Sequence, residues 1–225
     1  MSIFAISDLH LSFGTDKPMN IFRGWDNHTQ RLSANWKRLI KPEDTVVLPG
    51  DFSWALKLEE SAEDFRFLEN LPGKKILLKG NHDLWWSTAK KLREFWQENG
   101  FSSVDIVYNN CLVAEGYAIS GTRGWFYDNT GSKKVLLREA GRLDLSLKEA
   151  EKTGLPILTF LHYPPVYGEF VCDEILDVLK SHNIKKVYYG HIHGAGFNNA
   201  VKSYDGIEFR LISCDCIDFT PYFIV

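Results

Sequence analysis

Seven side chains of metal-binding types stand soon after short apolar runs of the chain. Asp8 and His10 follow the run Ile3–Ile6, and Asp51 follows the run Thr45–Leu48. The full set of candidate ligands is Asp8, His10, Asp51, Asn81, His162, His191 and His193. Carboxylate and amide oxygens combined with imidazole nitrogens, without cysteine, suit Mn, Fe, Zn or Co rather than a structural zinc site built on thiolates.

The number of these ligands indicates two metal ions rather than one. Two ions that share one bridging carboxylate would have four protein ligands each, which leaves positions open for water and substrate. Paired ions of this kind, about 3.5–4 Å apart, are used by hydrolases to activate water and to bind phosphoryl oxygens. The residue types therefore predict a two-metal hydrolase.

The elements expected to position these ligands are strands that alternate with helices. Nearly continuous apolar runs rich in Ile, Val, Leu and aromatic residues are typical of strands covered on both faces. The expected strands are Ile3–Ile6, Thr45–Leu48, Ile76–Leu78, Tyr117–Ile119, Ile157–Leu161, Val187–Tyr189 and Ile207–Ile212. In α/β sheets the carboxyl ends of the strands line the ligand crevice, so we expect the polar residues that follow them to converge.

Amphipathic helices are predicted between these strands, and the alternation defines an α/β protein. Apolar residues recur at helical spacing within 32–40, 85–96, 136–147 and 171–179. The turn signals Asn109-Asn110 and Asp205-Gly206 favour hairpins. Low-complexity segments and linker-like stretches are absent from the sequence, so we expect a single domain over residues 1–225.

Composition limits the partners that we expect. The formal net charge of -3 argues against binding of nucleic acid mainly by bulk electrostatics. No apolar stretch of the sequence approaches the roughly 20 residues that a membrane span needs. The first apolar run meets Asp8 too soon for a signal peptide, so we expect a cytoplasmic protein without a membrane or nucleic-acid partner. Cys214 and Cys216 are interpreted as buried free thiols, with a zinc or redox role as the alternative.

The motifs that hold the candidate ligands also carry a family resemblance. In chain order they read Asp-x-His, Gly-Asp, Gly-Asn-His-Asp, a lone His and Gly-His-x-His, from Asp8 to His193. This series resembles the calcineurin-like metallophosphoesterase superfamily, whose fold is a four-layer αββα sandwich with two mixed β-sheets flanked by helices. The resemblance implies one metal ion on Asp8, His10 and His193, a second on Asn81, His162 and His191, and Asp51 as the bridging ligand.

The resemblance further implies a role for His82, which is similar to the family's non-ligating histidine beside the substrate. We expect a hydroxide that bridges two divalent ions to attack phosphorus in line, while His82 protonates the leaving oxygen. No Ser or Cys within the motifs stands in a recognisable pairing with a base, so a phosphoenzyme is not expected. Manganese is the expected metal, with Fe, Zn or Co as alternatives.

The motifs depart from those of the protein serine/threonine phosphatase branch. The segment Gly50–Trp54 lacks that branch's second Asp and its Arg, and Lys79 and Asp83 stand in place of an Arg and a Glu. Because Lys does not reproduce the bidentate fork of Arg, a dedicated phosphoprotein phosphatase is not expected. We expect a small phosphate ester as substrate, either a monoester or a diester, and the sequence does not distinguish a nucleotide, a cyclic nucleotide, a sugar phosphate or a phosphoprotein. Asp83 is interpreted either as the orienting partner of His82 or as a charge at the N-terminus of a helix over Leu84–Asn99.

Two groups of residues remain open to different interpretations. Arg123, flanked by Gly121 and Gly124, is either a phosphate donor or a solvated side chain on a glycine-rich turn. Arg138 and Arg142 lie on one helix face and are interpreted as an exposed basic patch, with substrate binding as the alternative. Aromatic residues near the motifs either stack on a substrate base or pack in the core: Trp54, Trp85, Trp86, Trp125, Phe126 and Tyr127.

Two other functional classes compete with a phosphomonoesterase or phosphodiesterase. A nuclease of the same superfamily would need a basic channel, which the sequence does not indicate. A non-catalytic interaction module of this type would have lost metal ligands, whereas all seven candidate ligands and His82 are present here. We therefore expect a metal-dependent phosphoric ester hydrolase.

Overall fold

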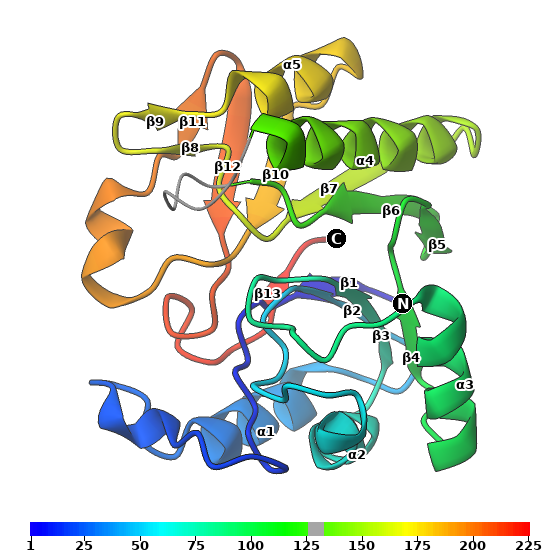
Figure 1. The fold of residues 1–225 in the computed structure, drawn as a ribbon, viewed down its shortest axis with the longest axis vertical. Coiled ribbons are helices and arrows are strands. Elements are labelled where there is room, and N and C mark those ends of the chain that lie inside the picture. The colour runs from blue at the N-terminus through cyan, green and yellow to red at the C-terminus, as the bar shows by residue number, and fades with distance from the viewer. Residues whose placement is uncertain (126–132) are drawn as a thin grey trace.

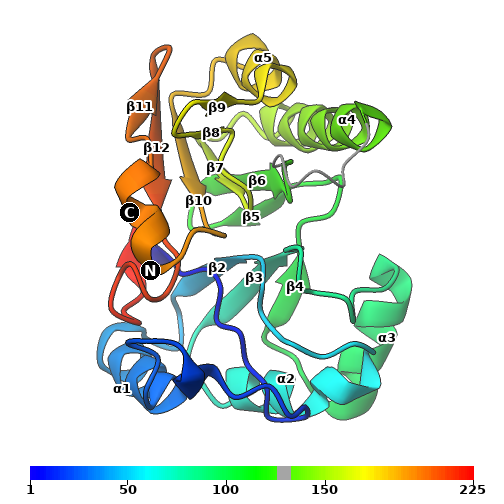
Figure 2. The same cartoon turned by 60° about the vertical axis from the view of Figure 1, so that its left-hand side comes forward.

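Two mixed β-sheets stacked face to face form the centre of the molecule, and helices cover both outer faces (Figure 1). The computed structural model describes residues 1–125 and 133–225. Seen after a turn of 60°, the helices α1, α2 and α3 lie beneath the lower sheet, and α4 and α5 lie above the upper one (Figure 2). The sequence-based expectation of a four-layer αββα sandwich is therefore confirmed.

The first sheet has five strands in the order β13-β1-β2-β3-β4. Its strands are β1 (Ile3–Ala5), β2 (Thr45–Pro49), β3 (Lys74–Leu78), β4 (Val104–Ile106) and β13 (Tyr222–Phe223). The four strands β1 to β4 run parallel, and β13 pairs with β1 in the antiparallel direction. The helices on its outer face are α1 (His28–Leu39), α2 (Ala62–Glu69) and α3 (Ala89–Asn99).

The second sheet has six strands in the order β11-β12-β10-β7-β6-β5. Its strands are β5 (Leu112–Ala114), β6 (Tyr117–Thr122), β7 (Ile157–Leu161), β10 (Lys186–Tyr189), β11 (Ser203–Tyr204) and β12 (Ile207–Leu211). The four inner strands are parallel, whereas β5 and β11 are antiparallel edge strands. The helices on its outer face are α4 (Lys133–Glu151) and α5 (Asp173–Ser181).

Shorter elements connect these layers. They are the 3-10 helices η1 (Met19–Ile21), η2 (Glu59–Ser61) and η3 (Gly194–Asn199), and the two-stranded pair β8 (Val166–Tyr167) and β9 (Phe170–Val171). Within the described residues, none of the helices combines the length and the apolar character that crossing a bilayer requires.

Three apolar layers hold the sheets and helices together, because each inner strand buries side chains on both of its faces. On β1, Phe4 packs toward the helices, while Ile3 and Ala5 pack toward the second sheet. Between the sheets, the rings of Phe160 and Tyr188 stack with centroids 5.3 Å apart. Burial on both faces explains why the strands read as continuous apolar runs rather than alternating ones.

The two sheets meet at the carboxyl ends of their parallel strands. The segment after β1 joins the segment after β12 through an isolated parallel bridge between Ser7 and Ser213. The Ser7 N–H donates to the carbonyl of Ile212 at 2.9 Å, and the Cys214 N–H donates to the carbonyl of Ser7 at 2.9 Å. The polar residues that follow strands of both sheets are therefore brought to one edge.

Three sequence-based expectations about local structure need correction. Helix α3 begins at Ala89 rather than Leu84, and Thr88 caps it by accepting a hydrogen bond from the Lys91 N–H at 3.3 Å. The hairpin into β6 turns at Glu115-Gly116 rather than Asn109-Asn110, and both of its turn residues have positive φ. Cys214 and Cys216 lie in a turn after β12, where Cys214 is buried and Cys216 is exposed. The hairpin at Asp205-Gly206 is confirmed.

Candidate metal centre

Backbone hydrogen bonds continue past the strand ends and tie the ligand-bearing loops to one another. The Asp8 N–H donates to the carbonyl of Gly50, and the His10 N–H donates to that of Asp51, each at 3.0 Å. In the second sheet, the Gly190 N–H donates to the carbonyl of His162 at 3.1 Å. These main-chain hydrogen bonds hold the loops together independently of their side chains.

Four of the seven predicted ligands adopt positive φ angles, which are uncommon for residues other than glycine. The φ angles are 62° for Asp8, 46° for His10, 52° for Asp51 and 70° for His191. A backbone in such regions costs roughly 1–3 kcal/mol per residue and persists where the surrounding structure enforces it. The sharp turns direct these side chains into the space between the two sheets' edges.

Glycines next to the ligands allow the loops to approach closely. A Cβ atom at Gly80 would lie 2.1 Å from Asp51 Oδ1, and one at Gly190 would lie 2.3 Å from Asp8 Oδ2. Such distances are far below van der Waals contact. The glycine of the Gly-Asn-His-Asp motif and that of the Gly-His-x-His motif thus make room for the carboxylates of other motifs.

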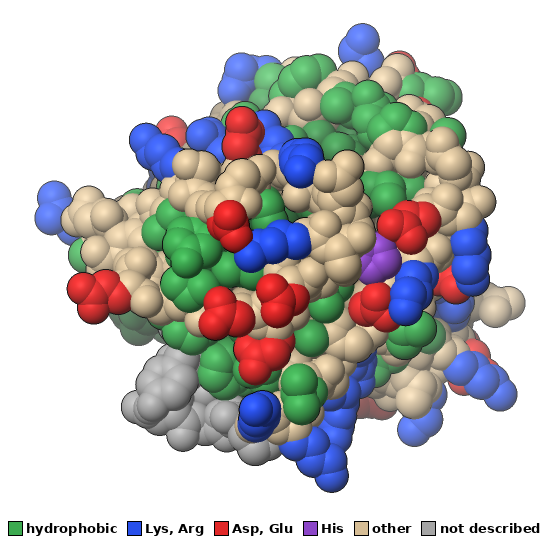
Figure 3. Space-filling view, turned by 90° about the horizontal axis from the view of Figure 1, so that it is seen from above, with side chains coloured by type: hydrophobic (Ala, Val, Ile, Leu, Met, Phe, Trp, Pro, Cys, Tyr) green, Lys and Arg blue, Asp and Glu red, His purple; other side chains and the backbone are tan. Residues whose placement is uncertain are grey.

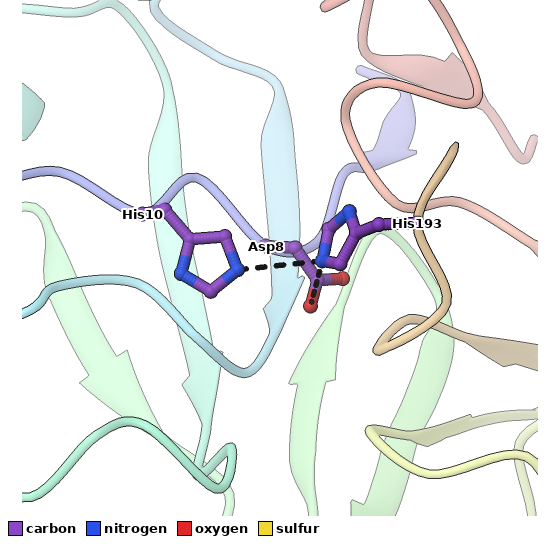
Figure 4. Close-up of side chains that lie close together, drawn as sticks. All are labelled: Asp8, His10 and His193. Atoms are coloured by element: carbon purple, nitrogen blue, oxygen red, sulfur yellow. Dashed lines mark hydrogen bonds and ion pairs between the residues drawn. The ribbon is translucent and has the colours of Figure 1, made fainter. Parts of the chain in front are cut away.

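Asp8, His10 and His193 form the first ligand group, with all three ligand atoms within 4.8 Å of one another. The close-up shows the three side chains pointing toward a common point (Figure 4). His10 Nε2 lies 3.3 Å from His193 Nε2, which in turn lies 3.4 Å from Asp8 Oδ1. Asp8 is fully buried, so its charge is shielded from bulk water.

Asp51, His162 and His191 form the second ligand group within the same limit of 4.8 Å. Asn81 completes it, because its Oδ1 atom lies 2.7 Å from His162 Nε2 and 3.0 Å from His191 Nδ1. His162 Nδ1 lies 3.1 Å from the carbonyl of Pro49, which can fix the orientation of that ring. The structure therefore brings all seven predicted ligands together at one edge.

One carboxylate oxygen joins the two groups. Asp51 Oδ2 lies 3.4 Å from His162 Nε2 in the second group and 3.9 Å from His10 Nε2 in the first. The other oxygen of this carboxylate accepts a hydrogen bond from the His82 N–H at 2.7 Å, which orients the group. The carboxylate of Asp51 therefore lies between the two ligand groups.

Charges in the centre compensate one another despite burial. Desolvation disfavours the ionised carboxylates, but His193, His162 and His10 around them hold the pKa of Asp8 far below its ordinary value. Desolvation likewise opposes ionisation of Asp51, and His162 and His10 nevertheless lower its pKa to about 2. Both carboxylates are therefore ionised at neutral pH.

The histidines divide into two kinds. Burial disfavours the charged ring of His193, but hydrogen bonds to Asp215 and Asp8 raise its pKa to about 10. Burial also opposes protonation of His162, but Asp51 raises its pKa to about 9. By contrast, burial lowers the pKa of His10 to about 4 and that of His191 to about 3. In the metal-free protein, His162 and His193 therefore carry the protons that balance Asp8 and Asp51.

Three residues that support the first group were missed by the sequence analysis. Asp215 Oδ1 lies 2.8 Å from His193 Nδ1, and Ser213 Oγ donates to Asp8 Oδ2 at 3.0 Å. The Cys214 thiol donates to the Asp8 carbonyl at 2.8 Å. Outer carboxylates that hold ligand histidines are a regular part of metal sites. The signal was available, because these residues also follow a predicted strand, Ile207–Ile212.

The donor set fits two divalent ions. Each group supplies one or two oxygens and two imidazole nitrogens, and the neutral rings of His10 and His191 are already in the protonation state that metal binding needs. The rings of His162 and His193 are oriented by the Pro49 carbonyl and the Asp215 carboxylate, respectively. This combination of oxygen and imidazole ligands suits Mn, Fe, Zn or Co.

His82 and Asp83 follow Asn81 but have different surroundings. The half-buried ring of His82 packs on Trp54 with centroids 4.3 Å apart and lies 5.7 Å from the ring of His10. Burial lowers the pKa of His82. Asp83 is fully buried, and burial together with the charge of Asp51 raises its pKa to about 6.

Asp83 binds backbone rather than the ring of His82. One of its oxygens accepts hydrogen bonds from the N–H groups of Asp51 and Gly80, at 2.9 and 2.8 Å. The other accepts from Phe52 N–H at 2.9 Å, Ser53 N–H at 3.3 Å and Trp85 Nε1–H at 3.0 Å. It also lies well before the first residue of α3. Both sequence-based interpretations thus give way to a role in which Asp83 holds the Asp51 loop against the Asn81 loop.

A cavity of about 440 Å³ opens beside the first ligand group. His10, His82 and His193 line it, together with the aromatic side chains of Trp25 and Trp54. Trp85, by contrast, is buried in the core against Phe65. Trp86 packs against the core beneath the first sheet, and Trp125 packs against the core of the second sheet. Phe126 and Tyr127 lie outside the described residues.

Arg123 is placed away from this cavity. Its guanidinium Nη2 lies 3.6 Å from Glu139 Oε1 on α4, and its Cζ lies 5.9 Å from the centre of the Tyr163 ring. It lines a second, smaller cavity with Lys79, Arg138 and Arg142. The structure therefore separates Arg123 from the residues around the first ligand group.

The fold and the ligand arrangement agree with a family comparison. The model of the calcineurin-like phosphoesterase family matches residues 1–195. The chain belongs to the calcineurin-like phosphoesterase family, a family of binuclear metal enzymes that hydrolyse phosphoesters. A search among curated proteins found no match.

Solved structures with low sequence identity share the fold. A protein of unknown function from Aquifex aeolicus, AQ665, is 21% identical with a TM-score of 0.54, over 99% of this chain and 95% of that one. The phosphopantetheinyl hydrolase PptH from Mycobacterium tuberculosis is 17% identical with a TM-score of 0.53, over 94% and 88% of the two chains. The protein TT1561 of Thermus thermophilus is 17% identical with a TM-score of 0.55, over 85% and 81%.

Replacement of Asp83 by Asn tests its role in joining the loops. The amide keeps the shape of the carboxylate, but its NH₂ group would face backbone N–H donors, which are then left without an acceptor. We expect a loss of about 2–4 kcal/mol in the free energy of unfolding, measured by denaturant titration. Asp26→Asn, at an exposed position, is the matched control and should change stability little. Equal stability of the two variants would contradict this role of Asp83.

Metal binding should strengthen as the pH rises. At pH 7 the rings of His162 and His193 are protonated, because their pKa values are about 9 and about 10, and an ion that enters either group must displace the one proton of that group's protonated histidine. We expect the apparent affinity of each group for Mn²⁺ to rise about tenfold per pH unit between about pH 6 and 8, measured by calorimetric titration.

The variant Asp215→Asn provides the control for this pH dependence. It removes one of the groups that raise the pKa of His193, so the pH dependence of the first group should become shallower than in the wild type. Mn²⁺ affinity that is independent of pH in the wild type would contradict the assignment of protons to His162 and His193.

Proposed function

We propose that this protein is a phosphomonoesterase or phosphodiesterase that depends on two divalent metal ions, with manganese as the first candidate. The proposed ligands of one ion are Asp8, His10 and His193, and those of the other are Asn81, His162 and His191, with Asp51 shared between them. The observation that carries this proposal is the position of Asp51 Oδ2, at 3.9 Å from His10 Nε2 and 3.4 Å from His162 Nε2.

When bound, the two ions would lower the pKa of a water molecule and stabilise negative charge on phosphoryl oxygens. The chain itself supplies the arrangement of ligands that makes this chemistry available. The buried Asp8 and Asp51 attract cations to the site, and the aromatic walls formed by Trp25 and Trp54 reduce its contact with water. Hydrolysis by PptH, a structure of similar fold, is consistent with phosphoester chemistry in this family.

His82 is proposed as the residue that assists the leaving group. Its backbone N–H is bound to Asp51, so the ring is anchored next to the shared ligand, and it lines the same cavity as His10 and His193. Because burial lowers its pKa, the neutral ring predominates near pH 7. A neutral imidazole still carries one N–H, which can donate to the oxygen that departs from phosphorus.

The substrate proposed is a small phosphate ester. The cavity beside the first ligand group has a volume of about 440 Å³, and small-molecule sites commonly range from about 300 to 1,000 Å³. Its walls combine aromatic faces with the cationic side chain of Arg23. An ester with an apolar or aromatic leaving group would suit such a lining.

Removal and return of metal tests the proposed hydrolase activity. Phosphate release from p-nitrophenyl phosphate and from bis-p-nitrophenyl phosphate should cease after chelation and return when Mn²⁺ is added. Asp51→Asn should lower both metal content and kcat, the latter by at least about 10³-fold, because the ligand shared by the two ions is weakened. Asp26→Asn is the control and should keep both. Wild-type protein that hydrolyses neither ester with Mn²⁺, Fe²⁺, Zn²⁺ or Co²⁺ would overturn the proposal.

His82→Ala tests the role of this ring independently of metal binding. The variant should retain its metal, because the seven proposed ligands are untouched. Its kcat should fall about 10²–10⁴-fold on an alkyl phosphate, whose leaving oxygen needs a proton, and much less on the p-nitrophenyl ester. Equal losses on the alkyl and aryl esters would show that His82 does not assist the leaving group.

A further inference from the structure

A second cavity lies beside the loops that carry the second ligand group. We call it the basic pocket and define it by Lys79, Arg123, Arg138, Glu139 and Arg142. Lys79 follows strand β3, Arg123 follows β6, and the other three side chains come from the first half of α4. Its volume is about 180 Å³, below the roughly 300 Å³ at which small-molecule sites begin. It therefore has room for one small group rather than a whole ligand.

The basic pocket carries an excess of three positive charges, since four cationic side chains face one carboxylate. Glu139 Oε1 lies 3.6 Å from Arg123 Nη2 and also 3.6 Å from Arg142 Nε. Its other oxygen accepts a hydrogen bond from Thr122 Oγ1 at 2.9 Å. Glu139 thus holds both guanidinium groups in place but neutralises less than they carry.

Two guanidinium nitrogens lack a hydrogen-bond acceptor among the described residues. They are the buried Nε atoms of Arg123 and Arg142, and the Nε atom of Arg142 faces Glu139 Oε1 at 3.6 Å, beyond hydrogen-bond distance. Buried donors without acceptors are costly and uncommon in proteins. Aromatic rings fix both side chains, with Arg142 Cζ 5.0 Å from the centre of the Tyr108 ring and Arg123 Cζ 5.9 Å from that of Tyr163.

The face formed by α4 and α5 carries acidic as well as basic side chains (Figure 3). This face is therefore not a uniformly cationic surface of the kind that tracks a nucleic-acid backbone. Several fixed donors around a space of this size are the arrangement that recognises a phosphate-like group.

The basic pocket is connected directly to the loops of the second ligand group. Lys79 is two residues before Asn81, so their Cα atoms lie within about 7 Å. The carbonyl of Arg123 accepts a hydrogen bond from the N–H of Tyr163, the residue after His162, at 2.8 Å. The loops that carry Lys79 and Arg123 are therefore continuous with, or hydrogen-bonded to, the loops that carry Asn81 and His162.

We propose that the basic pocket binds a second phosphate-like group of the substrate, so that the substrate class is a phosphate ester with two anionic phosphoryl groups. This inference rests on the proposed function, because it assigns a substrate feature to the same reaction. Arg123, Arg138, Arg142 and Lys79 bind the group that is not cleaved, and the ester at the metal centre is the one that is hydrolysed.

The first arm of the test measures anion binding without metal. Inorganic pyrophosphate is titrated calorimetrically, with chelator present, into the wild type, into Arg138→Gln/Arg142→Gln and into Arg38→Gln/Arg66→Gln. The last variant removes two positive charges from the exposed sides of α1 and α2 and is the matched control. We expect the pocket variant to weaken binding at least about tenfold and the control to bind like the wild type. Equal binding by all three proteins would overturn the pocket as an anion site.

The second arm distinguishes a substrate group from free phosphate. With Mn²⁺, kcat/KM is measured for alkyl monophosphates and for the matching bisphosphates of increasing chain length. The preference for bisphosphates should fall at least about tenfold in the pocket variant and persist in the control. One contrary result is a pocket variant that loses pyrophosphate binding and yet keeps the wild-type preference for bisphosphates in kcat/KM. That result would mean that the pocket binds free phosphate, and it would overturn the proposal.

Two further outcomes separate failure of this inference from failure of the proposed function. Hydrolysis of monophosphates without any preference for bisphosphates would contradict the proposed substrate class but would agree with the proposed hydrolase activity. Absence of hydrolysis with every substrate would overturn the proposed function and this inference with it. If the double variant does not fold, Arg138→Gln alone is used, because Arg138 is exposed and its loss should still weaken pyrophosphate binding about threefold or more.

Discussion

The structure of this protein depends on two buried carboxylates, Asp8 and Asp51, which lie in one space between the edges of two sheets. Their exposed fractions are 0% and 1%, so water does little to stabilise their charge. In the metal-free protein, protons on His162 and His193 supply the balance, which is why the pKa values of those rings are raised. Two divalent ions would replace these protons. The same attraction that keeps the loops together would thus hold the metals.

The rest of the fold serves this convergence. Parallel strands bring Asp8 and Asp51 to one edge, the Ser7–Ser213 bridge joins that edge to the second sheet, and the carboxylate of Asp83 ties the loop of Asp51 to that of Asn81. The positive φ angles at the ligands are the local cost of placing so many polar groups together. Apolar layers on both faces of each sheet provide the rigidity that maintains these turns.

Sequence patterns predicted an α/β protein and the gathering of seven ligands because residue type and strand ends are local features, whereas the four-layer sandwich was expected from the family resemblance. They failed where the outcome depends on packing between distant segments. The stripe that includes Trp85 indicated a helix, yet apolar spacing reports burial rather than backbone shape, and Trp85 packs on Phe65 from a turn. Asp83 was misplaced because its acceptor role depends on N–H groups of another loop. Asp215 was overlooked although it follows a predicted strand. The basic pocket could not be predicted, because it forms only when α4 is positioned against the ends of β3 and β6.

Anomalous diffraction from crystals grown with Mn²⁺ tests most directly whether Asp51 is shared by two metal ions. The account predicts two anomalous peaks about 3.5–4 Å apart, one among Asp8, His10 and His193 and the other among Asn81, His162 and His191, with the carboxylate of Asp51 in contact with both. A single peak, or two peaks of which Asp51 contacts only one, would contradict it.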